Sequence, residues 1–249
     1  MSNKRIVIVT GGSTGLGHAL LEQFNALTDE PQLLVNIARR KAKLNTDARH
    51  ELINITVDLR SEDGVAQAQN ALHGLLNEHA ASEVILIHNA GQVTPMGLST
   101  QLTNFKAIDE AFRLNVAAVM ALTATFLDAL TESTRQRIVL ISSGAGRSPI
   151  SGWAVYGATK AALDYYAQVL QQENPQLQCV ALAPGVIDTD MQAVIRGHQA
   201  DEFPPIERFI QLHAQQQLQS PTDTAIKIRN FVLSADFGQH LLDDLRNYG

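Results

Sequence analysis

Short apolar runs alternate with longer amphipathic stretches along most of the chain. Six of the runs predict buried strands, at residues 6–10, 33–38, 53–57, 84–88, 138–142 and 177–182. Helical spacing between them predicts helices at residues 15–27, 65–76, 105–130 and 153–170. Continuous apolar strands that alternate with helices indicate a parallel sheet covered by helices on both faces. We therefore expect a doubly wound α/β fold, which binds ligands at the carboxyl ends of its strands.

The C-terminal region has a weaker pattern. Residues 221–233 predict a further helix, whereas residues 239–245 leave open whether a seventh strand forms at the sheet edge. The Gln-rich stretch 211–219 is expected to form an exposed helix face. Because no stretch has the composition of a linker, residues 1–249 are expected to form a single domain.

Composition excludes several classes of function. The net charge of -6 argues against a nucleic-acid partner, because phosphate binding needs a basic surface. A single cysteine, Cys179, rules out an intramolecular disulfide and suits a reducing compartment. No apolar run reaches the roughly 20 residues of a membrane span, so we expect a cytoplasmic protein without a membrane partner. No His or Cys residues cluster at metal-ligand spacing, so no metal is expected.

A glycine-rich turn follows the first predicted strand and leads into a helix. It reads Thr10-Gly11-Gly12-Ser13-Thr14-Gly15-Leu16-Gly17. Glycines let the backbone approach a ligand closely, and a helix N-terminus presents free N–H groups to a phosphate. A tight structural turn has a similar composition, but the position after the first strand favours a dinucleotide site.

The end of the second strand bears on the type of dinucleotide. An acidic residue at this position binds the ribose 2′-hydroxyl of NAD, whereas arginine accommodates the 2′-phosphate of NADP. The sequence here is Ala38-Arg39-Arg40, which favours NADP(H). Arg39 is the first choice for the phosphate contact, because a guanidinium matches phosphate geometry, and Arg40 and Ser13 are further candidates.

Tyr156 and Lys160 are four residues apart on a predicted helix, so both side chains project from one helix face. Together with the Gly-x-x-x-Gly-x-Gly turn, this Tyr-x-x-x-Lys spacing resembles the short-chain dehydrogenase/reductase family. In that family a serine lies thirteen positions before the tyrosine, where this chain has Ser143, and Asn115 matches a fourth catalytic residue. The resemblance implies a Rossmann-like fold and a nicotinamide-dependent oxidoreductase.

The expected chemistry follows from these residue types. Hydride transfer to a ketone builds negative charge on the carbonyl oxygen, which must then receive a proton. A free tyrosine has a pKa of about 10, and a nearby lysine ammonium is expected to lower that of Tyr156. Ser143 is expected to bind the substrate oxygen. By resemblance, Lys160 also holds the nicotinamide ribose, and Asn115 holds a water that links Lys160 to solvent.

The resemblance also implies most of the remaining cofactor contacts. Asp58 and Leu59 lie beside the adenine in such enzymes, and Asn89-Ala90-Gly91 forms the bottom of the cofactor site. The preceding residue is His88, where the family frequently has Asn. The nicotinamide is expected to contact the turn after the sixth strand, at Pro184, Gly185, Val186, Ile187, Thr189 and Met191.

Residues from about 190 to 220 cover the substrate in enzymes of this family, as a small helical lid. The expected substrate contacts are Ser143, Gly144, Trp153, Tyr156, Val186 and Met191. Ser142-Ser143-Gly144-Ala145-Gly146, Gly152-Trp153, residues 188–192 and Arg208-Phe209-Ile210 resemble a narrower group. This group is the NADPH-dependent benzil reductases that form (S)-benzoin, which are similar to sepiapterin reductases. It implies a bulky ketone or 1,2-diketone as the small-molecule substrate.

Two alternatives stay open. One is another enzyme on the same scaffold, either a sepiapterin or other pterin-type reductase or an alcohol dehydrogenase that works oxidatively. The other is a catalytically silent NADP(H)-binding sensor, against which the complete set of Asn115, Ser143, Tyr156 and Lys160 argues. Relatives pair through the helices that hold Asn115 and Tyr156, so a homodimer or homotetramer is expected.

Overall fold

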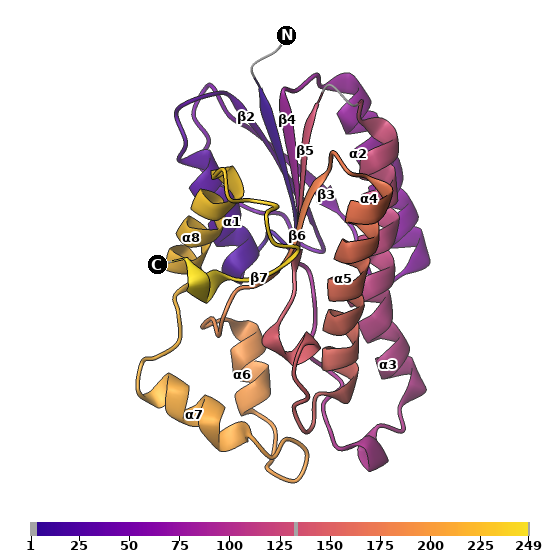
Figure 1. Ribbon diagram of the computed structural model, residues 1–249, viewed down its shortest axis with the longest axis vertical. Coiled ribbons are helices and arrows are strands. Elements are labelled where there is room, and N and C mark those ends of the chain that lie inside the picture. The colour runs from indigo at the N-terminus through magenta and orange to yellow at the C-terminus, as the bar shows by residue number, and fades with distance from the viewer. Residues whose placement is uncertain (1–3, 132–133, 249) are drawn as a thin grey trace.

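One seven-stranded parallel sheet forms the centre of the computed structural model, which describes residues 4–131 and 134–248 (Figure 1). The strand order is β3-β2-β1-β4-β5-β6-β7. The bounds are β1 Arg5–Thr10, β2 Gln32–Ala38, β3 Glu51–Thr56, β4 Glu83–His88, β5 Arg135–Ile141, β6 Gln178–Ala183 and β7 Leu242–Asp244. The six strands expected from the apolar runs are confirmed, and so is the doubly wound α/β class.

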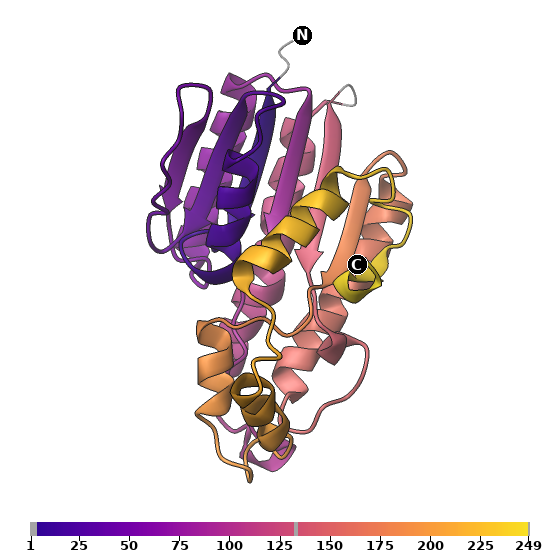
Figure 2. The same ribbon diagram turned by 90° about the vertical axis from the view of Figure 1, so that its left-hand side faces the viewer.

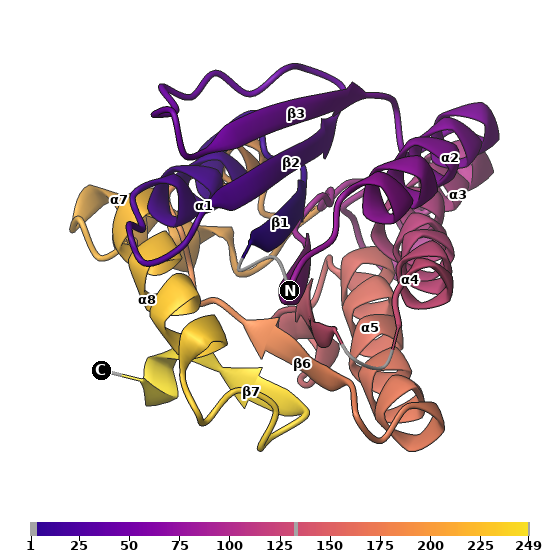
Figure 3. The same ribbon diagram turned by 90° about the horizontal axis from the view of Figure 1, so that it is seen from above.

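Helices cover both faces of this sheet (Figure 3). On one face lie α1 Gly15–Asn25 and α8 Pro221–Leu233, and on the other α2 Glu62–Glu78, α4 Ala118–Ala129 and α5 Ala154–Glu173. Side chains alternate along each strand, so Val7 packs toward α1 and α8 while Ile8 packs toward α2 and α4. Burial on both faces explains why the strands are continuously apolar.

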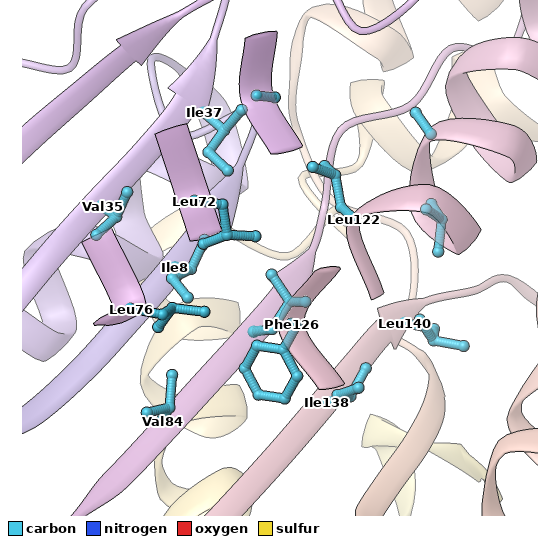
Figure 4. Packing of buried hydrophobic residues seen from close by; sticks show 14 of the residues in the cluster. Ile8, Val35, Ile37, Leu72, Leu76, Val84, Leu122, Phe126, Ile138 and Leu140 are labelled. Atoms are coloured by element: carbon cyan, nitrogen blue, oxygen red, sulfur yellow. The ribbon is translucent and has the colours of Figure 1, made fainter. Parts of the chain in front are cut away.

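The larger of the two cores is formed between the sheet and α2, α4 and α5. Leu72 and Leu76 of α2, with Leu122 and Phe126 of α4, pack onto the strand residues (Figure 4). All four side chains are buried. At about 1.5–3 kcal/mol for each large apolar side chain, burial of this kind anchors both helices to the sheet.

The strand order reverses between β1 and β4, because the chain moves from β1 to β2 and β3 on one side and from β4 to β7 on the other. The loops that follow β1 and β4 consequently run in opposite directions and leave a crevice at their carboxyl ends. Below this edge lie α6 Asp190–Arg196 and α7 Ile206–Ala214 (Figures 1 and 2).

The expected single α-helix at 105–130 is interrupted. It consists of α3 Phe105–Phe112, a π-helical turn at Arg113–Ala117 and α4. A π turn accommodates one more residue than an α turn, and such turns frequently occur at functional sites. Helical periodicity located the segment correctly but does not register the local widening around Asn115.

Residues Phe105–Ala129 make up the one helix, within the part of the chain that the structure describes, that is long and apolar enough to cross a membrane. Length and composition alone are weak evidence, since core helices pass the same test. Its α4 part packs on α2 through Leu122 and Phe126. The expected absence of a membrane partner stays a prediction.

Near the C-terminus, the structure answers one open question and corrects one expectation. A seventh strand, β7, does form and pairs in parallel with β6, but it is three residues long. The expected helix face at 211–219 is wrong beyond α7, which ends at Ala214. Gln216 has a φ of 55°, a left-handed conformation that does not continue a right-handed helix.

Candidate active site

A cavity of about 610 Å³ opens at the carboxyl ends of the strands. It is lined by the loops that follow β1 to β6, together with α6, α7 and the segment after β7. All the residues expected to contact cofactor or substrate line it, except Gly17. Asn115 also lies outside the lining, behind the cavity wall. Fold topology thus brings together residues from position 11 to position 246.

The glycine-rich turn is built by close backbone packing. A Cβ on Gly17 would lie 2.3 Å from the carbonyl oxygen of Gly11, and one on Gly11 would lie 3.1 Å from Ala90 Cα. Gly11 also has a φ of 71°, a conformation that favours glycine. Gly17 therefore supports the turn from behind, while the N-terminus of α1 faces the cavity. Thr14, the N-cap of α1, makes no side-chain capping hydrogen bond.

Arginines surround the end of the cavity next to β2. Arg39 and Arg40 are exposed on its rim, and Arg40 reaches Thr14 Oγ1 at 3.5 Å. Asp58, expected beside an adenine, has both carboxylate oxygens within 3.2 Å of Arg60. These hydrogen bonds hold the pKa of Asp58 below its usual value, and the charge of Arg39 adds to the effect.

The side chains of Tyr156 and Ser143 both line the cavity, and Ser143 lies close enough to the phenol to lower its pKa. Ser143 lies two residues after the end of β5, and its Oγ accepts a hydrogen bond from Ala145 N at 3.2 Å. Tyr156 lies in the first turn of α5, and 9% of its surface is exposed. Burial raises the pKa of Tyr156, an effect that the nearby hydroxyl of Ser143 partly offsets.

Lys160 lies one turn further along α5 and is buried. Its Nζ donates a 2.7 Å hydrogen bond to the carbonyl oxygen of Ile141, and it lies 5.6 Å from the centre of the Tyr156 ring. Burial lowers the pKa of Lys160 to about 8. The expected lowering of the Tyr156 pKa is not found in this structure, because burial has the larger effect on the phenol.

Asn115 uses its side chain to fix the loop after β4. Its Oδ1 accepts from Gln92 N at 2.9 Å, and its Nδ2 donates to Gln92 O at 2.9 Å and to Thr159 Oγ1 at 3.1 Å. This amide, which lies in the π turn, thus joins the loop after β4 to α5. A water held by Asn115 stays a prediction, and these contacts commit its amide group to protein partners.

The opposite end of the cavity has an aromatic wall. Trp153 stacks on Phe203 with ring centroids 4.9 Å apart and meets the edge of Tyr156 at 5.4 Å. Phe209 of α7 completes the group, 5.3 Å from Trp153. Gly152 makes this packing possible, because a Cβ there would lie 2.6 Å from Glu202 O.

Sequence reasoning did not identify several polar residues that line the cavity. Arg60 lines the cavity and forms an ion pair with Asp58, and Gln192 lines the cavity from α6. Asp244 and Arg246, from the segment that begins at β7, pair with each other at 2.5 Å. An arginine two positions after Asp58 was a usable local signal. The C-terminal pair had none, because only the pairing of β7 with β6 brings it near the cavity.

Residues 5–200 match the family model of the short chain dehydrogenases. The chain belongs to the short-chain dehydrogenase family. Membership makes it an oxidoreductase that uses a nicotinamide cofactor and acts between an alcohol and a carbonyl group. The cavity of this short-chain dehydrogenase is lined by the residues that the family resemblance implied, among them Ser143, Tyr156, Lys160 and most of the glycine-rich turn.

Individual relatives are similar over nearly the whole chain. A benzil reductase ((S)-benzoin forming) of Bacillus cereus is 34% identical, over 94% of this short-chain dehydrogenase and 96% of the relative. A sepiapterin reductase of Bos taurus is 30% identical, over 84% and 81% of the two chains. The crystal structure of the KRED1-Pglu enzyme superposes with a TM-score of 0.81 at 26% identity, covering 94% of this chain and 98% of that one.

Proposed function

We propose that this short-chain dehydrogenase is an NADPH-dependent carbonyl reductase that acts on a bulky ketone or 1,2-diketone. The observation that carries the proposal is that Ser143, Tyr156 and buried Lys160 line the same cavity, with Tyr156 and Lys160 one turn apart on α5. This group lies between an arginine-rich end and an aromatic end of one cavity. A hydride donor and a carbonyl substrate would meet at this point.

The residues at the arginine-rich end fit a dinucleotide. The close approach of Gly17 to Gly11 leaves backbone and the N-terminus of α1 at the surface, where a pyrophosphate binds favourably. Arg39 would hold a 2′-phosphate, with Arg40 and Ser13 beside it, and this supports NADPH over NADH. When bound, the reduced nicotinamide supplies the hydride.

Tyr156 would donate the proton in the reduction. Burial raises the pKa of its phenol, which therefore stays protonated at neutral pH, as a general acid requires. Ser143 would also donate to the substrate oxygen and stabilise the charge that develops there. With a pKa of about 8, Lys160 is largely charged at pH 7 and would stabilise the phenolate left after proton transfer.

The aromatic end supports a bulky, apolar substituent on the carbonyl carbon. Trp153 and Phe209 line the cavity with large rings, the buried ring of Phe203 lies behind Trp153, and Val186 and Met191 pack against this cluster. The similarity to benzil reductases supports an aromatic 1,2-diketone such as benzil. A pterin is the second candidate, supported by the similarity to sepiapterin reductases.

The decisive experiment measures NADPH oxidation with benzil, other aromatic ketones and sepiapterin, with NADH in parallel. We expect the highest kcat/KM for an aromatic diketone with NADPH. The Tyr156→Phe variant should lose about 10²–10⁴-fold in kcat, because it lacks the proton donor, and should still bind NADPH. If this variant kept its turnover, Tyr156 would not be the proton donor.

The same measurement separates the alternative classes. A silent NADP(H)-binding sensor would bind NADPH but would not oxidise it with any substrate in the panel. A pterin-type reductase would prefer sepiapterin, and an oxidative dehydrogenase would turn over alcohols with NADP⁺ faster than it reduces ketones.

The assembly expected from the family resemblance also belongs to this proposal. Phe105, Phe112, Met120 and Tyr165 are large apolar side chains exposed on α3, α4 and α5. Their exposure supports pairing through these helices as a homodimer or homotetramer. Light scattering at several protein concentrations tests this assembly.

A further inference from the structure

A buried carboxylate lies beyond the Tyr156–Lys160 pair on the same helix. Asp164 follows Lys160 by one turn of α5, and 5% of its surface is exposed. One carboxylate oxygen accepts from Ser142 Oγ at 2.6 Å, and the other accepts from Arg147 Nε at 2.9 Å. Ser142 is the residue next to Ser143, so Asp164 ties the strand end that carries Ser143 to the helix that carries Tyr156.

Arg147 extends this network across the sheet. Its Nη1 donates to Asp243 O of β7 and its Nη2 to Ala181 O of β6, each at 2.9 Å. The three nitrogen atoms of the guanidinium thereby hold α5, β6 and β7 in one arrangement. Asp164 is buried, and a buried carboxylate is costly unless it is paired, so Asp164 depends on the guanidinium of Arg147.

We propose that Asp164 is a positioning residue for the reduction, which holds the strand end that leads to Ser143 against the helix that carries Tyr156 and Lys160. The inference rests on the proposed function. Two ties connect the end of β5 to α5, namely Asp164 to Ser142 Oγ and Lys160 Nζ to Ile141 O. With both in place, Ser143 and Tyr156 keep a fixed arrangement on the wall of the same cavity.

The charge of Asp164 acts on Lys160 in a known direction. Burial lowers the pKa of Lys160 and the Asp164 carboxylate raises it, so the pKa of about 8 already includes this support. The other charged or titratable groups around the pair are Tyr156 on α5, Arg147 on the loop after β5, and Asp243 and Asp244 on β7. Only the α5 carboxylate lies one helical turn from the ammonium.

Two charge-removing variants have different expected effects on the pH profile. Asp164→Asn keeps the shape and removes the negative charge, so the alkaline limb of kcat should move down by about one pH unit. Arg147→Met removes the positive charge, so the same limb should stay in place or move up. If Asp164 had a purely structural role, both variants would lose kcat to the same extent, and the alkaline limb would not move differently in the two.

Ser142→Ala tests the positioning part separately, and it serves if Asp164→Asn does not fold. It removes one hydrogen bond and no charge, so kcat should fall by about tenfold at every pH with the alkaline limb unchanged. Glu173→Gln on the exposed end of α5 is the matched control and should match the wild type.

A second readout does not depend on activity. The pKa of Lys160 is measured in the cofactor-free protein by NMR titration of the lysine Cε–H signals, assigned by their loss in Lys160→Met. We expect a lower Lys160 pKa in Asp164→Asn than in the wild type.

An unchanged Lys160 pKa in Asp164→Asn, or equal downward shifts in both charge variants, would overturn the role of the charge. An unchanged kcat in Ser142→Ala would overturn the positioning role. Failure of the proposed function is distinguishable, because then the wild type itself reduces no carbonyl, while the NMR titration is still readable.

Discussion

The two ends of the parallel sheet both bury charge, but they do so differently. At the amino ends, Arg5 of β1 and Glu83 of β4 are register partners, and Arg5 Nε donates to Glu83 Oε2 at 2.6 Å. Arg137 lies 3.3 Å from the other oxygen of Glu83, and Glu30 also pairs with Arg5. At the carboxyl ends, Lys160 is equally buried but hydrogen-bonds to a neutral carbonyl, that of Ile141.

The difference shows what each arrangement is for. A buried ion pair whose charges neutralise each other keeps its protonation state and fixes the strands in register. A buried ammonium without a carboxylate in contact shifts its pKa toward neutrality, and Lys160 has a pKa of about 8. Groups with pKa values near the working pH suit proton chemistry, so strong perturbation marks the functional end of the sheet.

Removal of the ammonium should have the largest effect on activity. In Lys160→Met, the phenolate of Tyr156 loses its cation, so kcat should fall by about 10³-fold. The variant should be at least as stable as the wild type, because it no longer buries a charge. Steady-state kinetics and thermal unfolding measure the two effects. A variant that loses stability in proportion to activity would contradict the comparison.

Removal of the counter-charge at the opposite end should affect stability alone. Glu83→Gln leaves Arg5 and Arg137 buried without their carboxylate, so the free energy of unfolding should fall by about 3 kcal/mol. Denaturant unfolding measures this, and kcat should not change for the folded fraction. The control is Glu51→Gln, whose exposed pair with Lys4 at 3.9 Å should contribute less than about 0.5 kcal/mol.

Cofactor selection should respond to a charge at the cavity rim. Arg39→Ala removes the expected contact with the 2′-phosphate, so KM for NADPH should rise by about tenfold or more, as for a lost hydrogen bond to a charged group. KM for NADH serves as the internal control and should stay the same. Equal increases for both cofactors would assign Arg39 to another part of the site.

The smallest expected effect is on the pH dependence of stability. Because burial lowers the pKa of Lys160 from 10.5 to about 8, the unfolded chain holds this proton at pH values where the native protein releases it. Stability relative to Lys160→Met should therefore rise with pH above 8, by roughly 1 kcal/mol between pH 7 and pH 9. Denaturant unfolding of both proteins across this range tests the sign.

Much of the fold could be predicted because it depends on local patterns. The strands are buried on both faces, so the apolar runs located β1 to β6 to within a few residues. The site was predictable where ligand chemistry requires a fixed spacing, as for Tyr156 with Lys160 and for the glycine-rich turn. Each of these features lies within a short stretch of sequence.

The remainder depends on contacts between distant segments. Asp244 reaches the cavity only because β7 pairs with β6, and the Asp164 network joins residues from α5, β5, β6 and β7. The sign of the Tyr156 pKa shift was also not predictable, because it depends on how deeply the phenol is buried. Spacing in the sequence carries no measure of burial.

The π turn at Arg113–Ala117 has a consequence for the local geometry of Asn115 and not for the helices on either side. The wider turn takes up one residue more than an α turn, so α3 and α4 continue one another although their sequence periodicity is shifted by one position, about 100° on a helical wheel. Excision of a single residue there would leave a regular α turn and keep Leu122 and Phe126 against α2. It would remove the widening at Asn115, whose amide now bonds to Gln92 and Thr159.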